Sequence, residues 1–183
     1  MSKYFSIILG IIGLSFAIYE FKKNNEKKAI NGLGKIDYRK PPKVRIVYSR
    51  KENPQDRPKV SSSKNVYEWF KKIWSSQIST REEMYVLLLN RNNRILGYHQ
   101  LSMGGINGTV ADVRLLFATA VQSLATSVII AHNHPSGTLE PSNADIQLTD
   151  KIKEAGKLMD ISLLDHLIVT DYGYYSFADE GRM

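Results

Sequence analysis

The chain has 183 residues, a formal net charge of +7 and no cysteine, and 43% of its residues are hydrophobic. Its length is enough for one domain with a substantial core, and its near-average composition excludes wholesale disorder, collagen-like repeats and coiled coil. The lack of cysteine excludes a disulfide framework, a zinc site built from thiolates and a catalytic thiol.

Positive charge is concentrated in the N-terminal part of the chain. Residues 1–72 hold 17 Lys and Arg against 6 Asp and Glu, whereas residues 73–183 hold 8 against 12. Because the C-terminal part is mildly acidic, the whole-chain charge says little about what that part binds. The basic part is explained most simply by a nearby anionic lipid surface, with nucleic acid as the weaker alternative.

The first expected element is an uncharged apolar run over residues 4–19. As a helix it would be about 24 Å long, short of a hydrocarbon core of about 30 Å unless the flanking lysines extend outwards. We expect residues 1–21 to form a membrane anchor, with a cleaved signal peptide or a soluble helix as alternatives. The lysines that follow favour a cytoplasmic domain held at the inner face of the cell membrane.

Residues 22–59 are expected to form a basic linker. Within it, apolar and polar residues alternate over residues 43–49, which predicts one half-buried strand. One of the three serines at 61–63 should then cap a helix that ends near residue 74, because apolar residues recur there at helical spacing.

The remaining chain, residues 60–183, is expected to form one domain in which strands and helices alternate. Five strands are predicted, over residues 84–89, 95–101, 127–131, 161–170 and 174–177. An amphipathic helix is predicted after Asp112 and a second helix over residues 143–159. This order predicts an α/β sandwich with a mixed sheet.

The segment AHNHPSGTLEPSNAD, which ends at Asp145, contains the residues typical of metal chemistry. His132 and His134 stand two residues apart after a buried strand, so extended backbone puts both imidazoles on one side. Two imidazoles and one carboxylate match a catalytic Zn²⁺ site, whose fourth position is left for a water of lowered pKa. Asp145 alone also fits a helix cap begun by Ser142, but the three residues together favour the metal site.

These residues resemble the JAB/MPN metalloenzyme motif, also called JAMM, in its bacterial RadC-like form. The likeness runs from about residue 60 to the C-terminus, through LLLNRNNRILG, GGINGTVAD and ISLLDHLIVT. The resemblance implies a cytidine-deaminase-like α/β/α sandwich, here preceded by the N-terminal apolar helix. It also implies Zn²⁺ ligands at His132, His134 and Asp145.

The resemblance further implies two catalytic residues. Ser136 would support the zinc-bound water or the developing oxyanion. A glutamate at the start of the strand before the hairpin would take a proton from the water, and the family spacing favours Glu82 over the adjacent Glu83. Alternation along the strand directs these two side chains to opposite faces of the sheet, so only one of them can serve.

The function predicted from this likeness is a zinc-dependent metallohydrolase of the JAMM type that cleaves a peptide or isopeptide bond in a peptide or protein substrate. The alternative is a non-catalytic accessory module of the RadC type, associated with DNA repair or binding DNA, whose zinc would be structural. A zinc nucleobase deaminase is excluded, because it needs cysteine ligands. His99 and His166 are expected to be packed or hydrogen-bonded side chains rather than ligands.

Overall fold

The computed structural model describes residues 53–104 and 111–183. The predicted apolar helix at residues 4–19 and the predicted strand at residues 43–49 lie outside the described residues, so both stay predictions. Within the two described ranges, none of the helices is long and apolar enough to cross a membrane.

A mixed sheet of five strands forms the centre of the described part of the chain. In chain order the strands are β1 (Glu83–Leu89), β2 (Ile95–Met103), β3 (Ser127–Asn133), β4 (Ser162–Val169) and β5 (Tyr174–Ser176). Their order across the sheet is β2-β1-β3-β4-β5. β3 and β4 are parallel, and the other neighbouring pairs are antiparallel. The predicted α/β class with a mixed sheet is confirmed.

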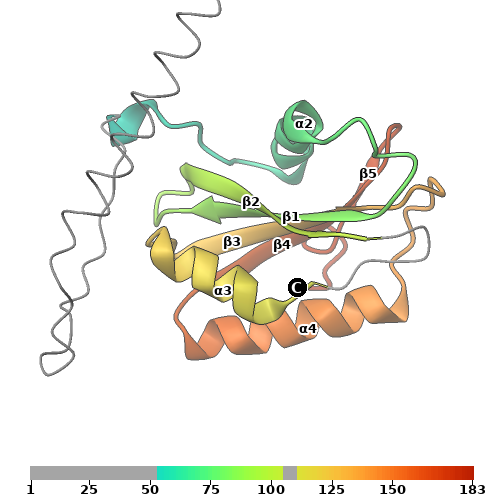
Figure 1. The fold of residues 1–183 in the computed structure, drawn as a ribbon. Coiled ribbons are helices and arrows are strands. Elements are labelled where there is room, and N and C mark those ends of the chain that lie inside the picture. Colours follow the sequence, from blue (N-terminus) through green and yellow to red (C-terminus); the bar gives the residue numbers. More distant parts are fainter. Residues whose placement is uncertain (1–52, 105–110) are drawn as a thin grey trace, which may run out of the picture. The chain divides into compact units, whose positions relative to one another are not determined.

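Helices cover both faces of this sheet (Figure 1). α2 (Ser63–Ile73) lies over one face, and α3 (Val113–Gln122) and α4 (Asn143–Leu158) lie over the other. A short 3₁₀ helix, η1 (Pro54–Asp56), precedes α2. Each α-helix starts after a side chain that accepts a backbone N–H, namely Ser62, Asp112 and Ser142. These caps agree with the starts that the sequence predicts.

An apolar core lies on each face of the sheet, between the strands and the helices that cover them, because alternate strand residues point to opposite faces. The core on the side of α3 and α4 includes Val86 and Ile130, and the core on the side of α2 includes Leu87 and Phe70. β1 and β3 are buried along their whole lengths. Polar side chains on these two strands are therefore exceptions, and most of them lie near one end of the sheet.

Close packing at Gly156 fixes the C-terminal part of α4. A Cβ atom at this position would lie 2.4 Å from the backbone oxygen of Ile161, just before β4. The backbone N–H of Ile161 also donates to the oxygen of Gly156 over 3.0 Å. Only glycine allows this approach, which fixes where the C-terminal end of α4 lies against the chain that enters β4.

Candidate metal centre

The candidate site lies at one end of the central strands, where the start of β1, the end of β3 and the start of α4 meet. β1 runs antiparallel to β3, so the start of β1 lies beside the end of β3, with Met84 opposite His132. α4 follows β3 after a loop and brings Asp145, in its first turn, back to this end. His132 is the second-last residue of β3, whose ladder runs two residues beyond the predicted strand because β1 and β4 pair with it on both sides.

The structure brings together the three predicted ligands, His132, His134 and Asp145. The Nε2 atoms of the two histidines are 2.9 Å apart. Asp145 places Oδ1 3.1 Å from the Nε2 of His132, and Oδ2 3.7 Å from the Nε2 of His134. One ligand atom from each residue lies within 4.8 Å of the other two. The three side chains thus meet between the end of β3 and the start of α4.

Asp145 caps the helix and faces the histidines at the same time. Its Oδ2 accepts hydrogen bonds from the backbone N–H of Ser142 over 2.8 Å and from the Ser142 hydroxyl over 2.6 Å. Burial alone would raise the pKa of Asp145, but contacts with His132, His134 and Ser142 hold it well below its usual range. The carboxylate is therefore ionised and oriented, which a metal ligand requires.

The hydrogen bonds of His134 determine which ring nitrogen faces the site. Its Nδ1 lies 2.7 Å from the backbone oxygen of Thr138. A carbonyl oxygen only accepts, so Nδ1 carries the hydrogen and Nε2 of the neutral ring presents its lone pair to His132 and Asp145. The largest cause of the raised pKa of His134 is the hydrogen bond that its protonated ring would donate to Asp145. Acceptors facing one another at these distances need a proton or a metal ion between them, and this donor set suits Zn²⁺.

Glu82 and Glu83 serve opposite faces of the sheet. Glu83 is fully buried on the side of α2, where its carboxylate accepts from the Ser75 hydroxyl over 2.8 Å and the Tyr85 hydroxyl over 3.2 Å. Burial and the charge of Glu83 raise the pKa of Tyr85 to about 12. Glu83 is thus held away from His132, His134 and Asp145.

Glu82 immediately precedes β1 and belongs to the other face. It is in step with Met84, which packs in the core on the side of α3 and α4 and pairs with His132. After the larger effect of Asp145, the negative charge of Glu82 adds to the raised pKa of His134. The side chain is half-buried. Of the two neighbouring glutamates, Glu82 is therefore the one beside the cluster.

Ser136 lies in the exposed loop that follows the second histidine. The loop turns here: the N–H of Gly137 donates to the oxygen of His134 over 3.0 Å, and the φ of Gly137, 82°, favours glycine. The Ser136 hydroxyl bonds within this loop, 3.3 Å from the Thr138 Oγ1. Its role beside a metal stays a prediction.

Sequence reasoning gave no role to Asn133, between the two histidines. Its side chain is fully buried; Oδ1 accepts from the backbone N–H of Glu83 over 2.7 Å, and Nδ2 donates to the oxygen of Arg81 over 2.9 Å. These bonds hold the residues on both sides of Glu82 against the end of β3. The signal in the sequence is the alternation itself, which directs residue 133 away from both histidines.

The sequence indicates no role in the site for His166 or Thr149. It predicts that His166 is packed or hydrogen-bonded, and the structure shows both: burial holds its pKa well below the ordinary value, and its ring contacts those of His132 and Phe177. Thr149 lies one turn after Asp145 on α4 and bonds to His166. His166 is thus linked to a predicted ligand.

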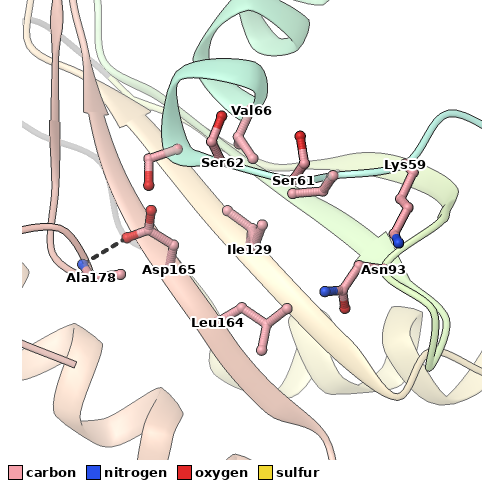
Figure 2. Close-up of a pocket in the computed structure, with 11 residues that line it drawn as sticks. Lys59, Ser61, Ser62, Val66, Asn93, Ile129, Leu164, Asp165 and Ala178 are labelled. Atoms are coloured by element: carbon pink, nitrogen blue, oxygen red, sulfur yellow. Dashed lines mark hydrogen bonds between the residues drawn. The ribbon is translucent and has the colours of Figure 1, made fainter.

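A pocket on the other face of the sheet lies between the start of α2 and β4 (Figure 2). Its buried carboxylate is Asp165, the neighbour of His166 along β4. The Asp165 oxygens accept from the backbone N–H groups of His166 and Ala178 over 2.8 and 3.0 Å, and from the Ser176 hydroxyl over 2.7 Å. These bonds tie β4 to the C-terminal residues, so Asp165 serves the fold.

Comparison with known proteins finds relatives along most of the chain. Residues 60–182 match the family model described as a RadC-like JAB domain. A UPF0758 protein of Flavobacterium johnsoniae is 40% identical over 164 residues, which cover 90% of this chain and 68% of the relative. A UPF0758 protein of Porphyromonas gingivalis is 53% identical over 104 residues, covering 56% and 46%. One of Methanosarcina mazei is 37% identical over 154 residues, covering 83% and 66%. The chain thus spans about half to two thirds of the length of these relatives.

Proposed function

Since the chain belongs to the RadC-like JAB domain family, as its motif predicts, we propose that it is a zinc-dependent metallohydrolase that cleaves a peptide or isopeptide bond. The single observation that supports this most strongly is the convergence of His132, His134 and Asp145 at one end of the central strands. Families of this type are often hydrolytic, and the three donors leave the fourth position of a tetrahedral zinc for water.

The exposure of the three donors fits a site that a substrate can reach. The His132 side chain is 2% exposed, whereas those of His134 and Asp145 are each 13% exposed. A buried ligand on one side and two partly open ligands on the other give a rigid site with an accessible side. A closed structural zinc site has four protein ligands instead.

A zinc ion held by these donors would act as a Lewis acid and lower the pKa of a water molecule. The protein would supply the proton transfers. Glu82, half-buried beside His134, would take a proton from the attacking water and return it to the leaving amine. Ser136 would support the zinc-bound water or the developing oxyanion.

Metal binding by the full chain tests the ligand set. The purified protein should bind close to one zinc ion, measured by calorimetric titration, and His132→Ala or His134→Ala should abolish binding. His99→Ala is the matched control, because His99 lies on β2 outside the cluster and its loss should leave the stoichiometry unchanged. Stoichiometric zinc in both cluster variants would refute the assignment.

Hydrolysis is tested with a library of peptides and lysine-linked isopeptides, read by mass spectrometry. Cleavage should need metal: a chelator should stop it and added zinc should restore it. A protein that binds zinc through the three donors but cleaves nothing in either class would favour the alternative, a non-catalytic accessory module of the RadC type.

Two further expectations accompany this proposal. The first is the cytidine-deaminase-like α/β/α sandwich that the resemblance implies, and the mixed sheet with helices on both faces supports this expectation. Attachment to the inner membrane face through residues 4–19 is the second. Deletion of residues 1–21 should move the protein from the membrane fraction to the supernatant, and an unchanged distribution would contradict the anchor.

A further inference from the structure

His166 contacts the ring nitrogen of His132 that faces away from Asp145. Its Nε2 lies 2.8 Å from the Nδ1 of His132, and its own Nδ1 lies 2.7 Å from the Oγ1 of Thr149. His166 is fully buried, and the Phe177 ring stacks on it with centroids 4.7 Å apart and planes 10° apart. The ring therefore has a fixed position, and each of its nitrogens has a partner.

The direction of these hydrogen bonds follows from one backbone carbonyl. The Thr149 hydroxyl lies 2.6 Å from the backbone oxygen of Asp145, which only accepts, so Thr149 donates its single hydrogen there. The Thr149 oxygen must then accept from His166, whose Nδ1 carries the hydrogen. The Nε2 of the neutral His166 ring is left as an acceptor.

The acceptor atom of His166 in turn fixes the tautomer of His132, one of the candidate ligands. Because His166 accepts at Nε2, His132 donates from Nδ1, and the lone pair of its Nε2 is directed at His134 and Asp145. This is the tautomer that a metal ligand needs. The reverse tautomer would direct a hydrogen at the place of the metal.

We propose that Thr149 and His166 are positioning residues that fix the tautomer and ring orientation of His132 through this hydrogen-bond chain. The chain starts on the backbone of Asp145 and ends on the side chain of His132, so it links two predicted ligands that come from different elements. The consequence for metal affinity rests on the proposed metal site, whereas the tautomer of His132 does not.

Variants of Thr149 test the chain without emptying the core. Thr149→Val keeps the shape but removes the hydroxyl, so His166 loses the acceptor that fixes its tautomer. Thr149→Ser keeps the hydroxyl and is the matched rescue variant. His166→Phe keeps the ring stacked on Phe177 and removes both hydrogen bonds.

The first readout is the affinity of the full chain for zinc. Changes to the partner of a metal-ligating histidine cost about 10- to 100-fold in metal affinity, which we expect for His166→Phe. Thr149→Val acts one bond further away, and we expect a loss of about 3- to 10-fold, scaled down from the same range. Thr149→Ser should bind zinc as the wild type does.

The second readout is the ¹⁵N NMR spectrum of the histidine rings in the metal-free protein. In the wild type and in Thr149→Ser, His132 should show a hydrogen on Nδ1 that exchanges slowly with solvent. Thr149→Val should populate the other tautomer. This measurement detects the tautomer directly, which a change in stability alone would not alter.

The outcomes separate this inference from the proposed function. A wild-type His132 with a hydrogen on Nε2 and none on Nδ1 in the metal-free protein would overturn the inference, whether or not zinc binds. So would a folded Thr149→Val protein with wild-type affinity and an unchanged tautomer. If zinc binds to no form of the protein, the proposed function fails, and the NMR result still decides the inference. If His166→Phe fails to fold, the Thr149 pair decides it.

Discussion

The two faces of the sheet receive polar side chains from the same stretches of chain and use them in opposite ways. On the side of α2, the carboxylates of Glu83 and Asp165 are buried and accept from hydroxyl or backbone donors. On the side of α4, His132, His134 and Asp145 turn acceptor atoms toward one another. The first arrangement is complete as it stands, and the second needs a proton or a metal ion between the acceptors. Matched substitutions on the two faces test this difference.

The largest expected effect comes from the paired glutamates. Glu82→Gln should lower the rate of any hydrolysis that the wild type performs by about 10²- to 10⁴-fold, because the proton acceptor is lost, while zinc still binds. Glu83→Gln should leave the rate per folded molecule nearly unchanged and lower the thermal midpoint, because a buried acceptor becomes an unmatched donor. Rates should be measured beside calorimetric unfolding. Equal rate losses in the two variants would remove the distinction between the faces.

Substitution of one aspartate on each face gives the next largest effect. Asp145→Asn should weaken zinc binding beyond the roughly 10- to 100-fold cost of outer-sphere changes, since a charged ligand is lost. Its effect on stability should be small, because the amide oxygen still accepts from Ser142. Asp165→Asn should bind zinc normally and lose about 1–3 kcal/mol of unfolding free energy, because one of its acceptors becomes a donor. Denaturant titration with and without zinc measures both, and a zinc defect in Asp165→Asn would contradict the division.

A shift of α4 is expected to affect the face of the sheet that holds the candidate ligands. Gly156→Ala places a methyl group 2.4 Å from the Ile161 oxygen, so α4 has to shift, at a cost of about 1–3 kcal/mol. Since α4 also bears Asp145, zinc affinity should fall as well. Gly97→Ala on β2 is the control, because its Cβ meets nothing within 4 Å. Unchanged stability and zinc affinity in Gly156→Ala would show that α4 accommodates the methyl group.

The smallest effect separates two helix caps. Ser62 and Ser142 each accept a backbone N–H at the start of their helices. Replacing either by Ala should cost about 1 kcal/mol of stability. Only Ser142 also donates to a predicted ligand, over 2.6 Å to Asp145, so only Ser142→Ala should lower zinc affinity, by a few-fold. A zinc effect of the same size in Ser62→Ala would attribute it to general destabilisation.

Local signals predict much of this fold. The hairpin, the helix starts and the order of strands and helices follow from apolar periodicity and capping residues, which act over a few positions. Ser142 with Asp145 is such a signal: the structure confirms the helix cap, and the same carboxylate also faces the histidines.

What the sequence does not predict depends on pairing between distant segments. Alternation places the side chains of Glu82 and Glu83 on opposite faces of the sheet. Which of these faces holds the candidate ligands depends on the pairing of Met84 with His132 across β1 and β3. The link from His166 to His132 needs the parallel register of β3 and β4 and the placement of Thr149 by α4. No local pattern in the sequence encodes these contacts.

Asp145 both caps α4 and faces the histidines, so fraying at the start of α4 would be coupled to metal occupancy of the proposed site. Fraying of the first turn of α4 would withdraw the carboxylate from the histidines along with the cap. A metal bound at the proposed site would therefore oppose fraying by its own binding free energy, which would grow with metal concentration above the dissociation constant. The backbone amides at the start of α4 should then exchange with deuterated solvent more slowly as metal is added, which makes them a reporter of occupancy that needs no substrate.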